Sequence, residues 1–195
     1  QGLEKWRRVY RDLPAPRRMY AAFVSTMDEI IGQLLSIVEA SGLSRDTIVI
    51  FQSDHGHSME ERTFGAGGNS GPYRGAKFSL FEGGIRVPAI ISWPGHLPEG
   101  QVRGQFASAI DWLPTIAELC DLNPPSHSID GRSLVPILRS ATAPDRHARF
   151  FWETGSRQRP QWAVRSGAWK LIGNPRDPSN KGPLTENDQR FLTNL

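Results

Sequence analysis

A short apolar segment at residues 47–51, Thr-Ile-Val-Ile-Phe, constrains the fold of this chain more than any other feature. Most of its residues are β-branched, and no polar residue alternates with them. Such a run is typical of a strand that is buried on both faces, as in a parallel sheet. We therefore expect an α/β fold in which this strand lies within a sheet that is flanked by helices.

Polar residues follow directly at the carboxyl end of this predicted strand, where the sequence reads Ser53-Asp54-His55-Gly56. Open α/β sheets bind their ligands at the carboxyl ends of the strands. A carboxylate is a hard ligand for Ca²⁺ or Mg²⁺, and an imidazole nitrogen is a common metal ligand. The pattern therefore indicates Asp54 and His55 as candidate metal ligands.

The segment before the strand predicts a helix over residues 17–40. Its apolar residues recur at spacings of three and four, which describes one face of a helix: Met19, Phe23, Met27, Ile30, Ile31, Leu34, Leu35 and Val38. Gly42 follows, where a helix commonly ends in a left-handed residue. A helix that leads into a buried strand is half of a βαβ unit, so we expect that its apolar face packs on a sheet.

A polar, glycine-rich loop at residues 58–74 separates the strand from the segment Gly75-Ala76-Lys77. Loops of this length are either functional or are flexible surface loops without a specific role, and the sequence leaves both interpretations open. Lys77 on the returning chain is a candidate anion-binding residue. His57, Glu60 and Glu61 are candidates to reach a substrate, and the sequence alone does not choose among them.

Residues 89–93 predict a second buried strand, and residues 112–122 predict a short helix with Asp111 as its N-cap. Cys120, the single cysteine, lies among apolar neighbours and is expected to be buried. Short aromatic and β-branched runs at 149–153, 162–165 and 169–172 predict an antiparallel sheet. We therefore divide the chain into an α/β part at 1–145 and a smaller C-terminal β subdomain at 146–195.

Three of these segments, taken in order, resemble the sulfatases of the alkaline-phosphatase-like superfamily. The segments are Ser53-Asp54-His55-Gly56, then Gly75-Ala76-Lys77, then residues 82–88, which read Glu-Gly-Gly-Ile-Arg-Val-Pro. The resemblance covers nearly the whole chain. It implies part of an alkaline-phosphatase-like α/β fold, a mixed or parallel sheet flanked by helices, with a small C-terminal antiparallel β subdomain.

The resemblance also implies roles for site residues. Asp54 and His55 would bind a divalent metal, most readily Ca²⁺ with Mg²⁺ as the alternative, although many family members have Asn where this chain has His55. Lys77 would contact the sulfate and stabilise the departing alkoxide, so it is the expected catalytic residue. Lys77 and His57 are the expected substrate-binding residues. Arg86 is interpreted as a structural ion-pair partner of Glu82.

The family nucleophile is a formylglycine made from the first residue of a Cys/Ser-x-Pro-Ser/Ala-Arg motif near the N-terminus. Cys120 is followed by Asp-Leu and does not match this motif. Ser70 begins a loose match, Ser-Gly-Pro-Tyr-Arg, but Tyr73 stands at the fourth position and the match follows the metal strand instead of preceding it. We therefore expect that this chain is the C-terminal portion of a longer sulfatase and is inactive by itself.

Other functions remain open at this point. A phosphodiesterase or phosphonate monoester hydrolase of the same superfamily shares the Asp-His strand, and a non-catalytic relative could act as a binding module. The substrate implied by the resemblance is a sulfated small molecule or carbohydrate. The oligomeric state is not indicated. Family resemblance suggests a periplasmic, secreted or lysosomal location.

Composition excludes some classes of function. Hydrophobic residues make up 38% and charged residues 22% of the 195 residues, as in ordinary globular proteins. The net charge is +3 and no long Lys/Arg run is present, so a nucleic-acid partner is not expected. No uninterrupted apolar run reaches the length of a membrane span.

Overall fold

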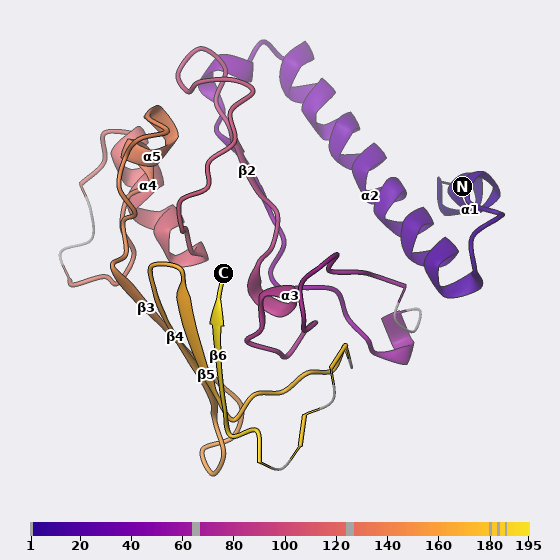
Figure 1. The fold of residues 1–195 in the computed structure, drawn as a ribbon. Coiled ribbons are helices and arrows are strands. Elements are labelled where there is room, and N and C mark those ends of the chain that lie inside the picture. Colours follow the sequence, from indigo (N-terminus) through magenta and orange to yellow (C-terminus); the bar gives the residue numbers. More distant parts are fainter. Residues whose placement is uncertain (1, 64–66, 124–126, 180, 183, 186) are drawn as a thin grey trace.

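The computed structural model describes residues 2–63, 67–123, 127–179, 181–182, 184–185 and 187–195. The chain has a pair of helices near the N-terminus, a two-stranded ribbon, and a four-stranded sheet toward the C-terminus (Figure 1). The chain combines helices with sheets, and the α/β class predicted from the sequence is confirmed.

Two helices, α1 (Gly2–Val9) and α2 (Ala15–Ala40), pack against each other. The indole of Trp6 and the ammonium of Lys5 both donate to the carboxylate of Glu29, at 3.0 Å and 2.8 Å. The helix predicted at 17–40 is confirmed, and Gly42 has the expected left-handed conformation with φ of 70°.

The apolar face of α2 is mostly exposed, contrary to the expectation that it packs on a sheet. Among the described residues of α2, Ala22 alone is buried, whereas side chains such as Phe23, Ile30 and Leu34 are exposed. The helix is also long and apolar enough to cross a membrane by length and composition. The sequence of this helix contains no uninterrupted apolar run of that length, because Asp28 and Glu29 lie near its middle.

The predicted strand at 47–51 corresponds to β1 (Val49–Gln52), which pairs antiparallel with β2 (Ala89–Ser92). Ile50 faces Ile91 in this register. Both strands exist as predicted, but the expected burial is wrong, because β1 is half-buried and β2 is largely exposed. In the described part of the chain β1 pairs with β2 alone, so its other edge lacks the neighbour that would bury it.

A short helix, α3 (Glu82–Ile85), lies between β1 and β2, and two more, α4 (Trp112–Leu119) and α5 (Val135–Arg139), lie between β2 and the C-terminal sheet. Asp111 precedes α4 as predicted, but its buried carboxylate accepts from Ser108 N and Arg132 N and not from the helix. It also lies 2.8 Å from the imidazole of His147. Cys120 is exposed, because it lies just beyond the end of α4, so its predicted burial is wrong.

The C-terminal sheet is antiparallel, as predicted, with strands in the order β3 (Arg149–Thr154), β4 (Gln161–Ser166), β5 (Trp169–Gly173) and β6 (Arg190–Asn194). The sequence analysis missed β6, whose five residues follow a long polar loop. Its register with β5 places Phe191 opposite Ile172.

The main apolar cluster joins this sheet to the segment around α3. It consists of Leu80, Phe81, Ala163 and Ile172, with Ile85, Trp152, Leu184 and Phe191 packed around them. A buried ion pair of 2.7 Å between Lys170 and Glu82 lies beside it, and Arg86 lies 3.8 Å from the other oxygen of Glu82, as predicted. The cluster contains residues from both sides of residue 145, and the division there stays a prediction.

Candidate active site

The carboxyl end of β1 lies directly against the α3 segment. The Ser53 amide donates to the Pro88 carbonyl at 3.2 Å, and the Gly56 amide donates to the Gly84 carbonyl at 2.8 Å. A Cβ atom on Gly56 would lie 1.9 Å from the carbonyl oxygen of Gly83, so only glycine permits this approach. Two of the sequence motifs are thereby held together by their backbones.

Asp54 and His55 are neighbours in space as well as in sequence. The His55 Nδ1 atom lies 2.8 Å from the Gly56 carbonyl oxygen, so Nδ1 is a donor and Nε2 is the ring nitrogen that could bind a ligand. Nε2 lies 3.1 Å from Asp54 Oδ2, and the Asp54 side chain is 83% exposed. The donor set, one carboxylate oxygen beside one imidazole nitrogen, fits a shared divalent cation.

As a candidate metal site, this pair alone would be incomplete. Within the part of the chain that the structure describes, no third Asp, Glu, His or Cys joins it to form a ligand cluster. Ca²⁺ takes at least six ligands and Mg²⁺ takes six, so further ligands would have to come from water, substrate or another polypeptide segment.

Lys77 is positioned by its own backbone. Its amide donates to the carbonyl of His57 at 2.9 Å. The backbone of Lys77 is therefore held next to His57, which follows the candidate metal ligand His55 by two residues. Its ammonium group lies 3.2 Å from a carboxylate oxygen of Glu60 and 4.9 Å from the centroid of the Phe78 ring. The Lys77 side chain is largely buried, so its charge is partly removed from water, where charged interactions are stronger.

His57 lies between the strand end and the glycine-rich loop. A Cβ atom on Gly68 would lie 2.4 Å from the His57 Cβ, and the carbonyl of Gly67 accepts from Arg17 at the start of α2, at 2.8 Å. Burial, followed by the positive charges of Lys181 and Arg17, lowers the pKa of His57 below its ordinary value of 6.5. The imidazole is therefore neutral at neutral pH and can accept or donate a hydrogen bond.

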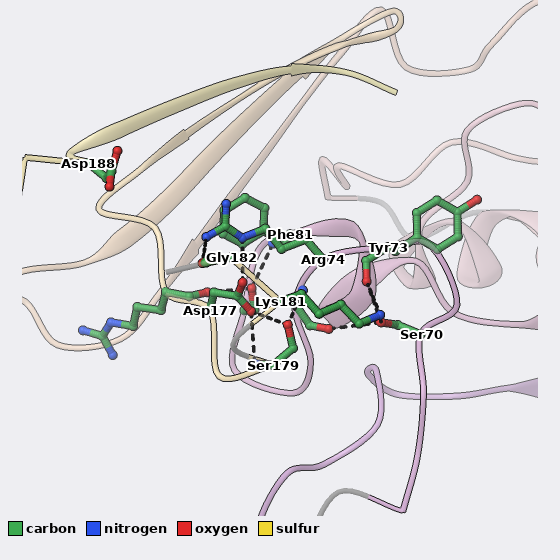
Figure 2. Close-up of polar contacts among 12 residues, drawn as sticks. Ser70, Tyr73, Arg74, Phe81, Asp177, Ser179, Lys181, Gly182 and Asp188 are labelled. Atoms are coloured by element: carbon green, nitrogen blue, oxygen red, sulfur yellow. Dashed lines mark hydrogen bonds and ion pairs between the residues drawn. The ribbon is translucent and has the colours of Figure 1, made fainter. Parts of the chain in front are cut away.

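The end of the glycine-rich loop is held by the loop between β5 and β6, as Figure 2 shows. The Lys181 ammonium donates to Ser70 Oγ and to the carbonyls of Gly71 and Tyr73, at 3.1, 2.7 and 3.0 Å. Ser70 Oγ in turn donates to the Tyr73 carbonyl at 2.7 Å. The Ser70 hydroxyl therefore closes a turn.

A second connection in the same region involves Arg74. Its guanidinium donates to the Asp177 carboxylate at 2.6 Å and also to the Gly182 carbonyl, and it stacks over Phe81 with 4.6 Å to the ring centroid. Asp177 also accepts from Ser179, whose hydroxyl accepts from the Gly75 amide at 3.1 Å. The loop that leads to Lys77 is thus tied to residues more than 100 positions later.

Sequence analysis missed these clamping residues. Lys181 and Asp177 lie in a loop rich in Pro, Asn and Asp, where neither periodicity nor a motif marks any position. The tertiary contacts alone reveal their roles. By contrast, the motif pattern found Asp54, His55 and Lys77 directly, and the structure brings their three segments together at one end of the β1–β2 ribbon.

Comparison with family models gives two matches. The sulfatase model matches residues 4–122, and the model of the C-terminal region of N-sulphoglucosamine sulphohydrolase matches residues 74–181. The two matches overlap across the Lys77 and α3 segments.

Curated relatives agree with these matches. Mouse steryl-sulfatase is 35% identical over 166 residues, which covers 81% of this chain and 27% of the relative. Human arylsulfatase D is 42% identical over 141 residues, which covers 70% of this chain and 24% of the relative. The chain thus spans about a quarter of the length of these relatives.

Solved structures show the same fold. The crystal structure of Ps i-CgsB in complex with a neocarrahexaose superposes with a TM-score of 0.81 at 24% identity, covering 99% of this chain and 40% of that one. The structure of BT4656 with D-glucosamine-2-N,6-O-disulfate superposes with a TM-score of 0.64 at 25% identity, covering 82% and 32%.

The fold and the ordered motifs define an alkaline-phosphatase-like α/β protein. Within that class, this chain belongs to the sulfatase family.

Proposed function

We propose that this chain forms the leaving-group side of a sulfatase active site, which hydrolyses sulfate esters to an alcohol and inorganic sulfate. The observation that carries the proposal is the hydrogen bond from the Lys77 amide to the His57 carbonyl. It holds the Lys77 backbone against His57, two residues after the Asp54–His55 pair, and the Lys77 ammonium group is partly desolvated. A cation and a metal site close together would stabilise the negative charge that builds up on the sulfate and on the leaving oxygen in the transition state.

Lys77 would act on the ester oxygen. In the overall reaction the S–O bond to the leaving group breaks, its electron pair stays on that oxygen, and water supplies the new oxygen on sulfur and the proton for the alcohol. An ammonium donor at the ester oxygen stabilises the charge that develops there. In the free protein Lys77 pairs with Glu60 at 3.2 Å, and the substrate sulfate would replace that carboxylate as its anionic partner.

Asp54 and His55 would hold a divalent cation, Ca²⁺ before Mg²⁺ because an exposed carboxylate tolerates the looser geometry of Ca²⁺. When bound, the cation would supply positive charge to the sulfate oxygens. His57, kept neutral by its surroundings, would contribute a hydrogen bond to the bound ester.

We further propose that the nucleophile, a formylglycine, comes from outside these 195 residues. Cys120 is exposed just beyond the end of α4, and the Asp-Leu that follows it does not match the formylglycine motif. Ser70 uses its hydroxyl to close a turn. The relatives are about four times as long as the matched region, which leaves room for a nucleophile. The 195-residue chain alone is therefore expected to be inactive.

The substrate class follows from the relatives as a proposal. The names of the curated relatives refer to aryl and steryl sulfates, and BT4656 was solved with a sulfated glucosamine as its substrate. We infer a sulfated carbohydrate or other small organic sulfate, in an exported compartment such as the periplasm, the lysosome or the extracellular space.

The test is sulfate release by the natural polypeptide that contains this chain. The substrate is 4-nitrophenyl sulfate, assayed with Ca²⁺ and with chelator, for the wild type and for Lys77→Ala. Lys77→Ala should lower kcat/KM by about 100-fold or more, as for loss of one transition-state donor. Lys5→Ala, an exposed lysine on α1, is the matched control and should leave the rate unchanged.

Other outcomes would overturn the proposal in distinct ways. Cleavage of a phosphate diester without sulfate release would move the protein to phosphoryl transfer. No detectable hydrolysis of either sulfate monoesters or phosphate diesters would indicate a non-catalytic relative. Sulfate release by residues 1–195 alone would contradict the external nucleophile.

A further inference from the structure

Phe78, the residue after Lys77, combines an unusual backbone with an exposed ring. Its φ is 74°, in the left-handed region, and its side chain is 64% exposed. The other described non-glycine residues with positive φ are Asp121 and Asn174, types that tolerate this region through their short polar side chains. A phenylalanine there is a genuine outlier.

A buried side chain from the C-terminal sheet holds this conformation. Gln161 at the start of β4 is 1% exposed, and its amide nitrogen donates to the Phe78 carbonyl at 3.1 Å. Its carbonyl oxygen accepts from the Leu80 amide at 3.0 Å. The same carboxamide therefore fixes the backbone at Phe78 and just beyond it.

The residues on both sides of Phe78 are anchored in the interior, whereas its ring is not. Ala76, Ser79 and Leu80 are buried, and the Ser79 hydroxyl donates to the Arg176 carbonyl at 2.7 Å. The backbone thus follows the core while the left-handed turn directs the ring outward. Strained conformations persist only where their surroundings determine them, and they cluster at ligand sites.

The ring also belongs to the surroundings of the proposed catalytic cation. The Lys77 ammonium lies 4.9 Å from the Phe78 ring centroid, within cation–π range. An exposed aromatic face beside an anion-binding ammonium can contact two parts of one molecule. The ammonium would take the charged ester, and the ring would take the apolar face of the group that carries it.

We propose that Phe78 is a specificity-determining residue that selects sulfate esters borne on a ring over those borne on a linear alkyl chain. This inference rests on the proposed sulfatase function. The aromatic face of Phe78 packs against the apolar face of an aryl or pyranose ring while Lys77 binds the ester oxygen. Gln161 is the positioning residue that presents the ring.

The test compares two kinds of substrate on the natural polypeptide. The ring-bearing substrates are 4-nitrophenyl sulfate and galactose 6-sulfate, and the linear one is butyl sulfate. Phe78→Ala should raise KM for the ring-bearing esters by about three- to tenfold, the range that aromatic pairing provides. The kcat should stay unchanged, since ring stacking is present before and during the reaction.

Two further variants control for aromaticity and for exposure. Phe78→Trp should restore the KM for ring-bearing esters, because the stacking face is kept. Phe151→Ala is the matched control, since Phe151 is 69% exposed on β3 and should leave KM for all three substrates unchanged. Comparing the two ring-bearing substrates shows whether the aryl or the sugar ring is preferred.

Phe78→Gly separates ligand binding from a structural role. Glycine adopts φ of 74° without strain, so this variant should keep or raise the urea midpoint while it loses the preference for ring-bearing esters. A lowered midpoint would show that Phe78 packs against another part of the protein and would overturn the proposal. An equal rise in KM for butyl sulfate would overturn it too, whereas absence of sulfate release from all substrates would instead overturn the proposed function.

Discussion

The guanidinium of Arg74 and the carboxylate of Asp177, 103 positions apart, form a hydrogen-bonded ion pair of 2.6 Å. The Asp177 side chain is 2% exposed, so its charge depends on this partner and on the nearby Ser179 donors. The pair attaches the C-terminal loop to the chain that leads into Lys77. The position of the proposed catalytic lysine therefore depends on residues of the loop between β5 and β6.

Breaking this pair should destabilise the protein. Asp177→Ala leaves the Arg74 guanidinium partly buried without its carboxylate, and we expect a loss of about 3 kcal/mol in the free energy of unfolding. Urea denaturation followed by tryptophan fluorescence measures it. The control is Arg7→Ala, which breaks an exposed pair with Glu4 in α1 and should change stability by less than about 0.5 kcal/mol. Equal effects for the two variants would contradict a structural role for Arg74–Asp177.

Glycine substitutions should have opposite effects at two sites. In Gly56→Ala the new Cβ would meet the Gly83 carbonyl oxygen at 1.9 Å, so the strand end must move away from α3, and we expect a loss of more than about 2 kcal/mol. Gly32→Ala in α2 meets no atom within 4 Å and should gain roughly 0.5–1 kcal/mol through helix propensity. Thermal unfolding of both variants tests the pair, and a neutral Gly56→Ala would refute the close contact.

Metal binding should depend on Asp54. Adding Ca²⁺ should raise the urea midpoint of the natural polypeptide, because a ligand that binds only the folded state stabilises it, and chelator should reverse the shift. Asp54→Asn should abolish this response, since it removes the carboxylate charge. Asp46→Asn changes an exposed aspartate that precedes β1 and should leave the response intact. A calcium shift that persists in Asp54→Asn would exclude Asp54 as a ligand.

The proposed site residues could be named from the sequence because they lie in short, ordered motifs. Asp54 and His55 follow an apolar strand, and Lys77 precedes a glycine pair, so local patterns locate all three. The helix over α2 and the strands β3 to β5 were likewise predictable from periodicity. Hydrogen bonding and apolar spacing within one element leave a direct signature in the sequence.

Features that depend on distant neighbours were not predictable. The partial exposure of β1 depends on which elements pack around it. An apolar run has the same sequence whether it is fully buried or only half-buried. Gln161 and Lys181 act on residues about 80 and 110 positions earlier, and nothing in their local sequence distinguishes them from solvent-exposed polar residues. The left-handed φ of Phe78 is also invisible, because tertiary contacts override the backbone preference of phenylalanine.

The lowered pKa of His57 predicts a dependence of stability on pH. Burial, together with Lys181 and Arg17, lowers the pKa of His57 in the folded state below 6.5, so the unfolded chain binds the proton more readily. Stability then rises with pH wherever the unfolded state holds more protons. The contribution of neutral His57 is fully present above pH 6.5 and is lost as the pH falls through the lower, folded-state pKa.

His57→Gln should remove this part of the pH dependence, because glutamine keeps a polar side chain of similar reach without titrating. We expect the urea midpoint of the wild type to fall more steeply than that of His57→Gln between pH 7.5 and pH 5. His127→Gln alters an exposed histidine and should follow the wild-type curve. If His57→Gln kept the wild-type slope, the imidazole would be freely protonated in the folded protein, and its assignment as a neutral hydrogen-bonding group at the site would be wrong.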